Sequence, residues 1–483
     1  MSTTAQARPV GVTEASNPAT LEKIGAINNT DMERLPEIFS KARTAQKRWA
    51  AMPFSQRRLY ILKMRDYIVE HAEDLAKVVS QNNGKSRTDA LATEVIPCAL
   101  ACTWYANHAA KVLKSKDLWP SSILFLNKRS RLVRLPLGVV GIISPWNYPL
   151  SLPFGEVVMG LMAGNAIILK VAAAVPLVGQ AIEQIVAAGE LPDGLFCHLV
   201  GSGGAVSKAF FDNRIDKIFF TGSVPIGKQL MAEAATTLTP LSLELGGKDP
   251  MIVLADADLE RAANGAAWAG YQNAGQSCGG VERIYVHESV YEAFVDLLAR
   301  KTKAMRHGVD TDFNVDMGAM TTRNQLQTVQ RHVDSAVQGG AKIIAQSRAV
   351  GEQKGYFYPA TLMTEVNHSM ELLREETFGP VLPVMKFRTT DEAVELANDC
   401  SMALTSSVWT RNNALGREVA MRIQAGVTTV NDHLYTHGLA ETPWGGWKDS
   451  GLGRTHGALG LEEMTQAKLI NWDILPSKRN IWW

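Results

Sequence analysis

The sequence predicts an α/β protein in which two units of alternating strands and helices follow a helical segment. From about residue 131 onward, short continuous apolar runs alternate with helical patterns, and each run is followed by a polar or glycine-rich turn. Runs this short suit strands that are buried on both faces, as in a parallel sheet. The length of 483 residues also exceeds one ordinary domain, which implies two or three substructures with sizeable cores.

The first part of the chain, to about residue 115, is mostly helical in pattern. In residues 33–52 and 56–84 apolar side chains recur at intervals of three and four, and Gly84 is placed to end the second run. From Arg131 the sequence pattern changes to one that predicts extended segments. The first α/β unit is predicted from strands at 166–170, 195–200 and 217–220.

A second α/β unit is predicted to begin near residue 241. Its strands are expected at 241–245, 251–254 and 283–286, with a helix over 288–305. Asp256 or Asp258 is well placed to cap a helix that runs towards Gln272, because an aspartate can accept from the free N–H groups of a first helical turn.

Composition favours a protein that acts on small molecules. Lys and Arg number 49 and Asp and Glu 48, so the net charge of +1 gives no field that would attract nucleic acid or an anionic membrane. No apolar run reaches the roughly 20 residues needed to span a bilayer, and the start of the chain lacks the apolar stretch of a signal peptide. The five cysteines, few and odd in number, predict a reducing, cytoplasmic setting without a disulfide framework.

Two local features have ordinary explanations. Cys98 and Cys102 lie four apart in a helical pattern, but no second Cys or His pair at metal-ligand spacing accompanies them, so no metal site is predicted. The C-terminal residues 480–483, Asn-Ile-Trp-Trp, lack a basic amphipathic helix beside them. We therefore expect them to pack on the protein rather than to anchor it in a membrane.

A glycine turn follows the predicted strand at 217–220. Gly222, Ser223 and Gly227 lie in this turn and at the start of the helical pattern after it. A strand, a turn and a helix start present free backbone N–H groups and the positive end of a helix dipole, which suits a dinucleotide pyrophosphate. The spacing differs from G-x-G-x-x-G, so a purely structural turn is the alternative.

Cys278 lies in a glycine-bounded loop, residues 273–280, between a predicted helix and a predicted strand. A thiol there can act as a nucleophile if its surroundings favour the thiolate, and it is inert if they do not. Glu244 ends an apolar strand between two leucines, where its charged form is disfavoured and its pKa rises towards that of a general base. An ion pair between Glu244 and Lys248 or an arginine is the alternative.

Asn147 and Glu376 are two further polar residues with either a functional or a structural interpretation. Asn147, between Pro145 and Pro149, can either donate a fixed hydrogen bond to a developing oxyanion or bond its own backbone. Glu376, in the segment EETFGP, suits either a ribose-binding carboxylate or a solvated loop.

Taken together, these motifs resemble those of the aldehyde dehydrogenase superfamily from about residue 15 to about residue 475. The blocks SPWNYP, IILKVA, FFTGSVPIG, LELGGKDP, NAGQSC, EETFGPV and PWGGWKDSG occur in the family's order. By this resemblance, Cys278 is the catalytic thiol, Glu244 the general base and Asn147 the oxyanion-binding amide. The positions implied to contact NAD or NADP are Trp146, Lys170, Ala173, Gly203, Gly222, Ser223, Gly227, Leu245, Glu376 and Phe378.

The resemblance also implies a reaction. The Cys278 thiolate attacks an aldehyde, a hydride leaves for the nicotinamide, and water activated by Glu244 hydrolyses the resulting thioester to the acid. A coenzyme A-acylating enzyme is an alternative, but relatives of that type generally lack the glutamate at position 244. A non-catalytic structural relative would be expected to have lost the thiol or the base.

Substrate and cofactor choice are implied by fewer positions. Tyr148, Leu152 and Trp444 match tunnel-lining positions, which implies a mainly apolar mouth and an aliphatic or aromatic aldehyde. Semialdehydes and aminoaldehydes are the alternatives, although no arginine anchor for a carboxylate is evident. Strictly NAD-using relatives carry a glutamate where this chain has Ala173, three residues after Lys170. Without that carboxylate the 2′-phosphate of NADP is not repelled, so both cofactors are expected.

The resemblance implies three parts for the chain. These are a Rossmann-like NAD(P)-binding domain at 1–115 and 137–247, an α/β catalytic domain at 248–445, and a small β oligomerisation arm at 116–136 and 462–475. Residues 129–135, RSRLVRL, alternate polar and apolar side chains as a half-exposed strand does. Relatives pair such arms, so a homodimer or homotetramer is expected.

Overall fold

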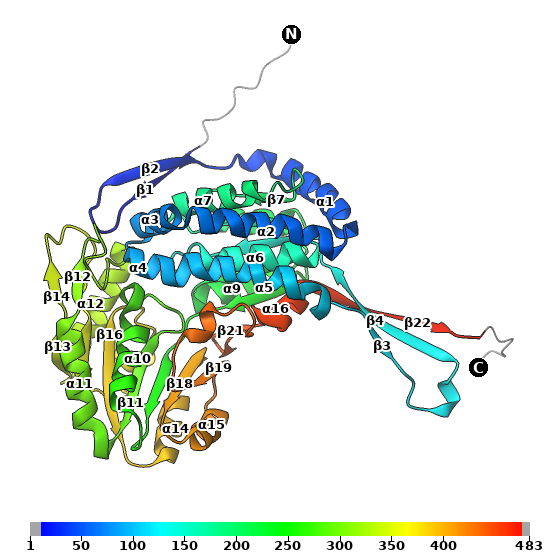
Figure 1. Cartoon of the computed structure of the whole chain (residues 1–483). Helices are drawn as coiled ribbons and strands as arrows, with labels where there is room; N and C mark the ends of the chain where they lie inside the picture. Colours follow the sequence, from blue (N-terminus) through cyan, green and yellow to red (C-terminus); the bar gives the residue numbers. More distant parts are fainter. Residues whose placement is uncertain (1–10, 476–483) are drawn as a thin grey trace, which may run out of the picture.

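The computed structural model describes residues 11–475, so the C-terminal tryptophans of the sequence analysis lie outside the described residues, as does the start of the chain. Two sheets with their helices form the body of the molecule, and a narrow arm projects from it (Figure 1). The predicted α/β class is confirmed.

The first sheet has six strands in the order β21-β9-β8-β5-β6-β7, and its strands are parallel except for β21, which runs antiparallel to β9. Every residue of β5 and β6 is buried, as expected for strands covered on both faces. The strands are β5 (Val139–Ile143), β6 (Ala166–Lys170), β7 (Phe196–His198), β8 (Lys217–Thr221), β9 (Leu241–Glu244) and β21 (Gly451–Leu452).

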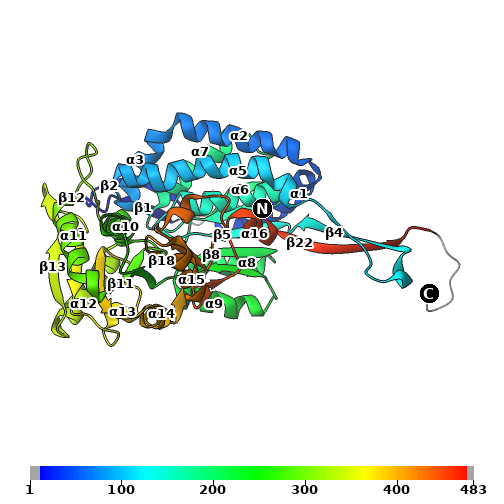
Figure 2. The same cartoon turned by 60° about the horizontal axis from the view of Figure 1, so that its bottom comes forward.

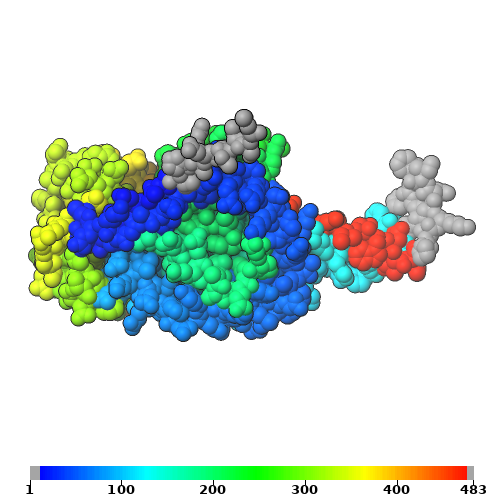
Figure 3. All heavy atoms as spheres, turned by 90° about the horizontal axis from the view of Figure 1, so that it is seen from above, coloured from blue at the N-terminus to red at the C-terminus, as the bar shows by residue number. Residues whose placement is uncertain are grey.

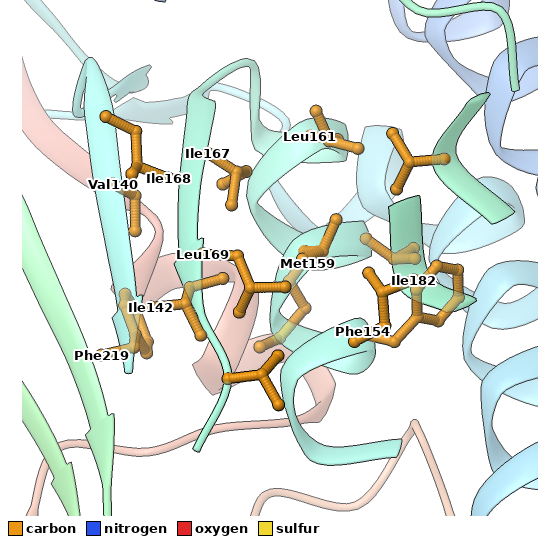
Figure 4. Packing of buried hydrophobic residues seen from close by; sticks show 14 of the residues in the cluster. Val140, Ile142, Phe154, Met159, Leu161, Ile167, Ile168, Leu169, Ile182 and Phe219 are labelled. Carbon is orange, nitrogen blue, oxygen red and sulfur yellow. The ribbon is translucent and has the colours of Figure 1, made fainter. Parts of the chain in front are cut away.

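Helices cover this sheet on both faces (Figure 2). The helices of this part are α1 (Leu35–Ala51), α2 (Phe54–Glu70), α3 (Ala72–Asn83), α4 (Arg87–Ala90), α5 (Ile96–Val112), α6 (Ser151–Ala163), α7 (Pro176–Ala188), α8 (Gly203–Asp212), α9 (Val224–Ala235) and α16 (Gly457–Glu463). Figure 4 shows Ile142 and Leu169 of the sheet packed towards Met159 of α6. The helical pattern at 56–84 is divided at His71 into α2 and α3, and Gly84 ends α3 in a left-handed conformation, as predicted.

The second sheet has seven strands in the order β13-β15-β16-β11-β10-β18-β19, parallel except for β13 against β15. Its strands are β10 (Asp249–Val253), β11 (Val281–His287), β13 (Lys342–Gln346), β15 (Thr361–Thr364), β16 (Val381–Phe387), β18 (Thr405–Trp409) and β19 (Val427–Val430). One detail of the predicted second unit is wrong. The strand at 241–245 pairs with β8, so it closes the first sheet rather than opening the second.

The helices around the second sheet are α10 (Leu259–Tyr271), α11 (Tyr291–Ala304), α12 (Arg323–Gln338), α13 (Glu371–Arg374), α14 (Thr390–Asn398) and α15 (Asn413–Arg422). Asp258, one of the two aspartates predicted as caps, accepts from the backbone N–H of Arg261 at 3.1 Å. Asp256 instead accepts from the Thr410 hydroxyl. The short strands of the chain are β1 (Val12–Ser16), β2 (Lys23–Asn28), β12 (Arg306–Gly308), β14 (Arg348–Val350), β17 (Met402–Ala403) and β20 (Trp447–Lys448).

The projecting arm is a three-stranded antiparallel sheet of β3 (Lys116–Leu118), β4 (Lys128–Pro136) and β22 (Thr465–Asp473). β4 and β22 pair over nine positions, from Pro136↔Thr465 to Lys128↔Asp473. The view from above shows the arm standing clear of the two-sheet body (Figure 3). No helix among residues 11–475 is long and apolar enough to cross a membrane.

Candidate active site

Cys278 follows a tight loop whose backbone enters a conformation that few residues adopt. Asn273, Ala274 and Gly275 have φ values of 52°, 53° and 69°, three left-handed residues in succession. For two non-glycine residues this arrangement costs energy, so the surroundings must hold it in place. At Gly275 a Cβ would also collide with the backbone of Gly379, which adds a second reason for glycine there.

Buried polar contacts hold this loop. The backbone N–H of Asn273 donates to the Asp89 carboxylate at 2.9 Å, and the Asn273 amide donates to the carbonyl of Gln276 at 3.0 Å and to that of Asn147 at 2.9 Å. Gln276 in turn accepts from the backbone N–H of Thr321 at 2.9 Å. The Asn273 side chain therefore ties the loop that carries Cys278 directly to the segment that carries Asn147.

The backbone of Asn147 is fixed from a second side as well. Its carbonyl accepts from the buried Lys85 ammonium at 2.9 Å, and Lys85 pairs with Glu94 at 2.6 Å. Both side chains of this ion pair are fully buried, so the pair is shielded from screening by salt. The side-chain amide of Asn147 makes no hydrogen bond within residues 11–475, although its oxygen is buried. The amide is thus positioned by its backbone and keeps its donors for a ligand.

Glu244 ends β9 as a buried carboxyl group with no hydrogen-bond partner on either oxygen among the described residues. The ion pair considered from the sequence does not form, because Lys248 pairs with Glu282 of β11 at 2.5 Å. Burial raises the pKa of Glu244 well above its usual value, and the nearby Glu156 raises it further, while Arg454 lowers it. The protonated form of Glu244 is therefore more favoured than in an exposed glutamate, and neither carboxyl oxygen is engaged by another described residue.

Two glycines after Glu244 permit the close approach of the segments around it. A Cβ at Gly247 would lie 2.5 Å from the carbonyl oxygen of Cys278, and one at Gly246 would collide with the carboxylate of Glu376. Side chains at these positions would therefore separate β9 from the Cys278 loop. This explains in physical terms why the LELGGK block carries glycine twice.

The Cys278 thiol is protonated at neutral pH in this setting. Burial raises the pKa of Cys278, and the carboxylates of Glu376, Asp249 and Glu244 raise it further, whereas the backbone N–H of Gly279 lowers it. Glu376 itself has its pKa raised by burial to about 8. Burial therefore favours the neutral forms of both the Cys278 thiol and the Glu376 carboxyl group.

Cys278, Asn147 and Glu244 line one cavity of about 240 Å³. Its other walls include the predicted cofactor positions Trp146, Gly222, Ser223, Leu245, Glu376 and Phe378. The rings of Trp146 and Phe378 meet edge to face at 5.4 Å, and Glu376 accepts from the backbone N–H of Gly247 at 3.2 Å. The predicted helix start lies at the same place: α9 follows Ser223, whose side chain makes no capping hydrogen bond. Gly227 packs on Leu245.

The remaining predicted cofactor positions gather at the end of β6, outside the lining of this cavity. Lys170 is buried and forms no ion pair within residues 11–475, and burial lowers its pKa. A Cβ at Gly203, in the first turn of α8, would lie 3.9 Å from the Lys170 ammonium. Ala173 is exposed in the loop after β6. A cation without a counter-charge beside a helix N-terminus suits an anionic or hydroxyl-rich ligand.

A second, larger cavity of about 590 Å³ adjoins the Cys278 loop. Its lining includes Tyr148, Gln272 and His433. The Gln272 amide donates to the Tyr148 hydroxyl, and His433 lies 2.9 Å from the carbonyl oxygen of Gly279, the residue after Cys278. We refer to this space as the outer cavity.

The three predicted substrate positions are placed differently around the outer cavity. Tyr148 lines it. Leu152 lines a small side chamber that shares Pro97, His437 and Gly438 with the outer cavity. Trp444 is buried behind His437, with the two rings 4.9 Å apart. Other apolar residues that line the outer cavity, such as Leu100 and Trp268, were not among the predicted substrate positions.

Comparison with known proteins places the chain. The family model for the "Aldehyde dehydrogenase family" matches residues 5–470. The chain belongs to the aldehyde dehydrogenase family.

The relatives of this aldehyde dehydrogenase are named for different substrates and cofactors. It is 36% identical over 448 residues to a 4,4'-diapolycopene aldehyde oxidase of Methylomonas sp, covering 92% of this chain and 83% of that protein. It is 37% identical over 433 residues to a putative NADP(+) succinate-semialdehyde dehydrogenase of Mycobacterium tuberculosis, covering 89% and 83%. The NAD+ complex of an aldehyde dehydrogenase from Bacillus cereus superposes with a TM-score of 0.91 at 33% identity, covering 96% and 94%.

Several residues of this aldehyde dehydrogenase site escaped the sequence analysis. Lys85 and Asn273 position the backbone of Asn147, and Arg261, His433 and His437 line the outer cavity. Only Asn273 carried a signal, since it lies in the NAGQSC block. Among residues 11–475 no cluster of three or more His, Cys, Asp or Glu could hold a metal ion.

Proposed function

We propose that this aldehyde dehydrogenase oxidises an aliphatic or aromatic aldehyde to the carboxylic acid, with Cys278 as nucleophile and with NAD or NADP as the acceptor. The observation that carries the proposal is that the Cys278 thiol, the Asn147 amide and the Glu244 carboxyl line one cavity, the last two without a side-chain hydrogen bond to any described residue. In the overall reaction the aldehyde, water and NAD(P)+ give the acid, NAD(P)H and a proton.

In this proposal Cys278 attacks the carbonyl carbon after losing its proton, and the Asn147 amide donates to the oxyanion that develops. Loss of one such donor typically costs about 3 kcal/mol of barrier. Asn273 and Lys85 support this role because they hold the Asn147 backbone and so fix where its amide points. A nicotinamide dinucleotide, when bound, accepts the hydride.

Glu244 serves the second half of the reaction. The thioester on Cys278 must be hydrolysed, and the Glu244 carboxylate takes the proton of the attacking water. Its raised pKa makes the carboxylate a stronger base than that of an exposed glutamate, and its lack of a partner among the described residues leaves both oxygens available. The same residue argues against transfer of the acyl group to coenzyme A, and the presence of both thiol and base argues against a non-catalytic relative.

The residues around the cavity fit a dinucleotide. Glu376 is held by the Gly247 N–H in the wall beside Cys278, and it would bind the nicotinamide ribose. Lys170 and Gly203 would bind the adenosine half, because Lys170 lacks a counter-charge among the described residues. Ala173 leaves room and no negative charge beside Lys170, so we propose that NADP is admitted as well as NAD.

The arm supports a homodimer or homotetramer as the working assembly. β22 ends the arm sheet, and Leu469, Ile470 and Trp472 on it are exposed. A strand edge that no other described strand covers, with exposed apolar side chains, is a surface that proteins normally bury. Light scattering coupled to size-exclusion chromatography tests this part of the proposal, and a monomer at micromolar concentration contradicts it.

The activity is tested with purified protein and a panel of aldehydes, by following the near-ultraviolet absorbance of NAD(P)H with and without coenzyme A. We expect NAD(P)H formation that does not depend on coenzyme A, with the free acid as product. Absence of NAD(P)H formation with every aldehyde, or an acyl-coenzyme A product, contradicts the proposed function.

A further inference from the structure

The outer cavity is much larger than a small aldehyde requires. Its volume of about 590 Å³ lies in the range of sites that enclose drug-sized ligands. Three of its lining residues, Tyr148, Gln272 and His433, are tied to the segment around Cys278. The outer cavity therefore adjoins the Cys278 loop, and a substrate whose carbonyl group reaches Cys278 from this side would have the rest of its chain in the cavity.

Large apolar side chains gather at the outer rim of this cavity. They come from three separate parts of the chain: the start of α5, the last turn of α10 and the loop after β19. Four of them are strongly exposed, namely Ile96 at 53%, Leu100 at 48%, Trp268 at 45% and Tyr435 at 62%. Single exposed apolar residues are ordinary, but a group that surrounds the mouth of a cavity marks a surface for an apolar ligand.

The charges around the outer cavity do not form an anchor for an anion. Burial lowers the pKa of His433 to about 4 and, with nearby His456 and Lys85, that of His437 to about 3, so both imidazoles are neutral. Arg261 lines the cavity, which the sequence analysis did not foresee, but Asp432 lies in the same wall and interacts with it electrostatically. The opposite charge of Asp432 offsets the attraction of Arg261 for a carboxylate.

We propose that the physiological substrate is a long apolar aldehyde whose chain fills the outer cavity and leaves it past the rim of Ile96, Leu100, Trp268 and Tyr435. This inference rests on the proposed aldehyde oxidation and narrows its substrate class. Each methylene group that moves from water into the cavity strengthens binding roughly fourfold. A carboxylated semialdehyde would place a charge against these apolar side chains and would lose that gain.

The test compares straight-chain aldehydes from butanal to decanal, together with succinic semialdehyde, on the wild-type protein with NAD(P)H formation as readout. We expect kcat/KM to rise by at least about a hundredfold from butanal to decanal, and succinic semialdehyde to be a poorer substrate than butanal. A flat dependence on chain length, or a preference for succinic semialdehyde, overturns the substrate class while the proposed oxidation stands. Absence of turnover with every aldehyde means that the proposed function has failed, and the inference with it.

A rim variant separates the apolar mouth from a general effect on the fold. Leu100→Ser should lower kcat/KM for decanal by at least about fivefold and leave that for butanal within about twofold. Leu59→Ser is the matched control, because Leu59 lies on α2 with a similar exposure of 56% but lines no wall of the outer cavity. If Leu100→Ser reduces both substrates equally, or if Leu59→Ser gives the same selective loss, the rim does not contact the substrate and the inference is overturned.

Discussion

The cavity that Cys278 lines, here called the inner cavity, and the outer cavity are built in opposite ways. The inner one holds ionisable groups, Glu244 and Glu376, whose pKa values are raised by burial, and glycines let its walls approach closely. The outer one is wide, its imidazoles are neutral, and exposed apolar side chains lie at its rim. Under the proposed function, chemistry and substrate choice would lie in separate cavities. Substitutions in the inner cavity should then affect the rate or the cofactor, and substitutions in the outer cavity should affect the preference for chain length.

The largest effect on activity is expected from substitution of Cys278. Cys278→Ser should lower kcat by at least about a thousandfold, because a serine hydroxyl without a strong base beside it is a poor nucleophile. Cofactor binding, measured by protein fluorescence quenching, should remain nearly intact. Cys197→Ser is the control, since Cys197 is also a free thiol but lies on β7. Retention of more than about a tenth of the wild-type rate would show that Cys278 is not the nucleophile.

Glu244→Gln should affect the later of the two chemical steps. Rapid mixing with aldehyde and cofactor should give a burst of NAD(P)H close to one per active site, followed by turnover at least about a hundredfold slower than wild type. The cause is that glutamine cannot take the proton of the hydrolytic water. Glu395→Gln removes an exposed carboxylate elsewhere and should leave the kinetics unchanged. Wild-type steady-state turnover without a burst would falsify the assignment.

The choice between NAD and NADP tests the residues at the end of β6, Lys170 and Ala173. We expect wild-type kcat/KM with NADP to lie within about a hundredfold of that with NAD, a gap under about 3 kcal/mol. Ala173→Glu should shift preference towards NAD by at least about tenfold, because its carboxylate repels the 2′-phosphate near Lys170. Ala173→Gln has nearly the same size without the charge and should shift the preference much less. Discrimination against NADP beyond about a thousandfold in the wild type contradicts this interpretation.

The smallest effect concerns the ionisation of the thiol. The charge of Glu376 raises the pKa of Cys278, and Glu376 is itself charged only above a pKa of about 8. Glu376→Gln should therefore speed the alkylation of Cys278 by iodoacetamide above about pH 8 and leave it unchanged at pH values well below that. Mass spectrometry of the Cys278 peptide distinguishes this thiol from the other four. Equal alkylation rates over the whole pH range would mean that the two groups do not interact.

The comparison of the cavities also shows what the sequence could predict. Strands and helix ends depend on short-range sequence patterns, so they could be predicted. Examples are the continuous apolar segment that forms β6 and the glycine at position 84 that ends α3. The motif blocks indicated Cys278, Glu244 and Asn147, and the structure brings the three to one cavity. Their chemical roles stay predictions, as do the domain boundaries.

The outer cavity could not be read in the same way, because its walls come from segments far apart in the chain. Arg261 on α10 and Asp432 after β19 approach each other only in the folded protein. No sequence pattern therefore shows that their opposite charges offset each other. For the same reason the sequence could not decide whether Glu244 forms an ion pair with Lys248 or remains unpaired. The partner of Lys248 proved to be Glu282, a residue on a neighbouring strand, and no spacing rule identifies such a pair.

The late position of two pairing strands has a consequence for synthesis of the protein on the ribosome. β9 receives its antiparallel neighbour β21 only when residues 451–452 emerge, and β4 waits for β22 at 465–473. Until then both strands present open edges to other nascent chains. A truncation before residue 451 should consequently yield protein that binds chaperones and aggregates, even though all of the residues that line the inner cavity have already been made.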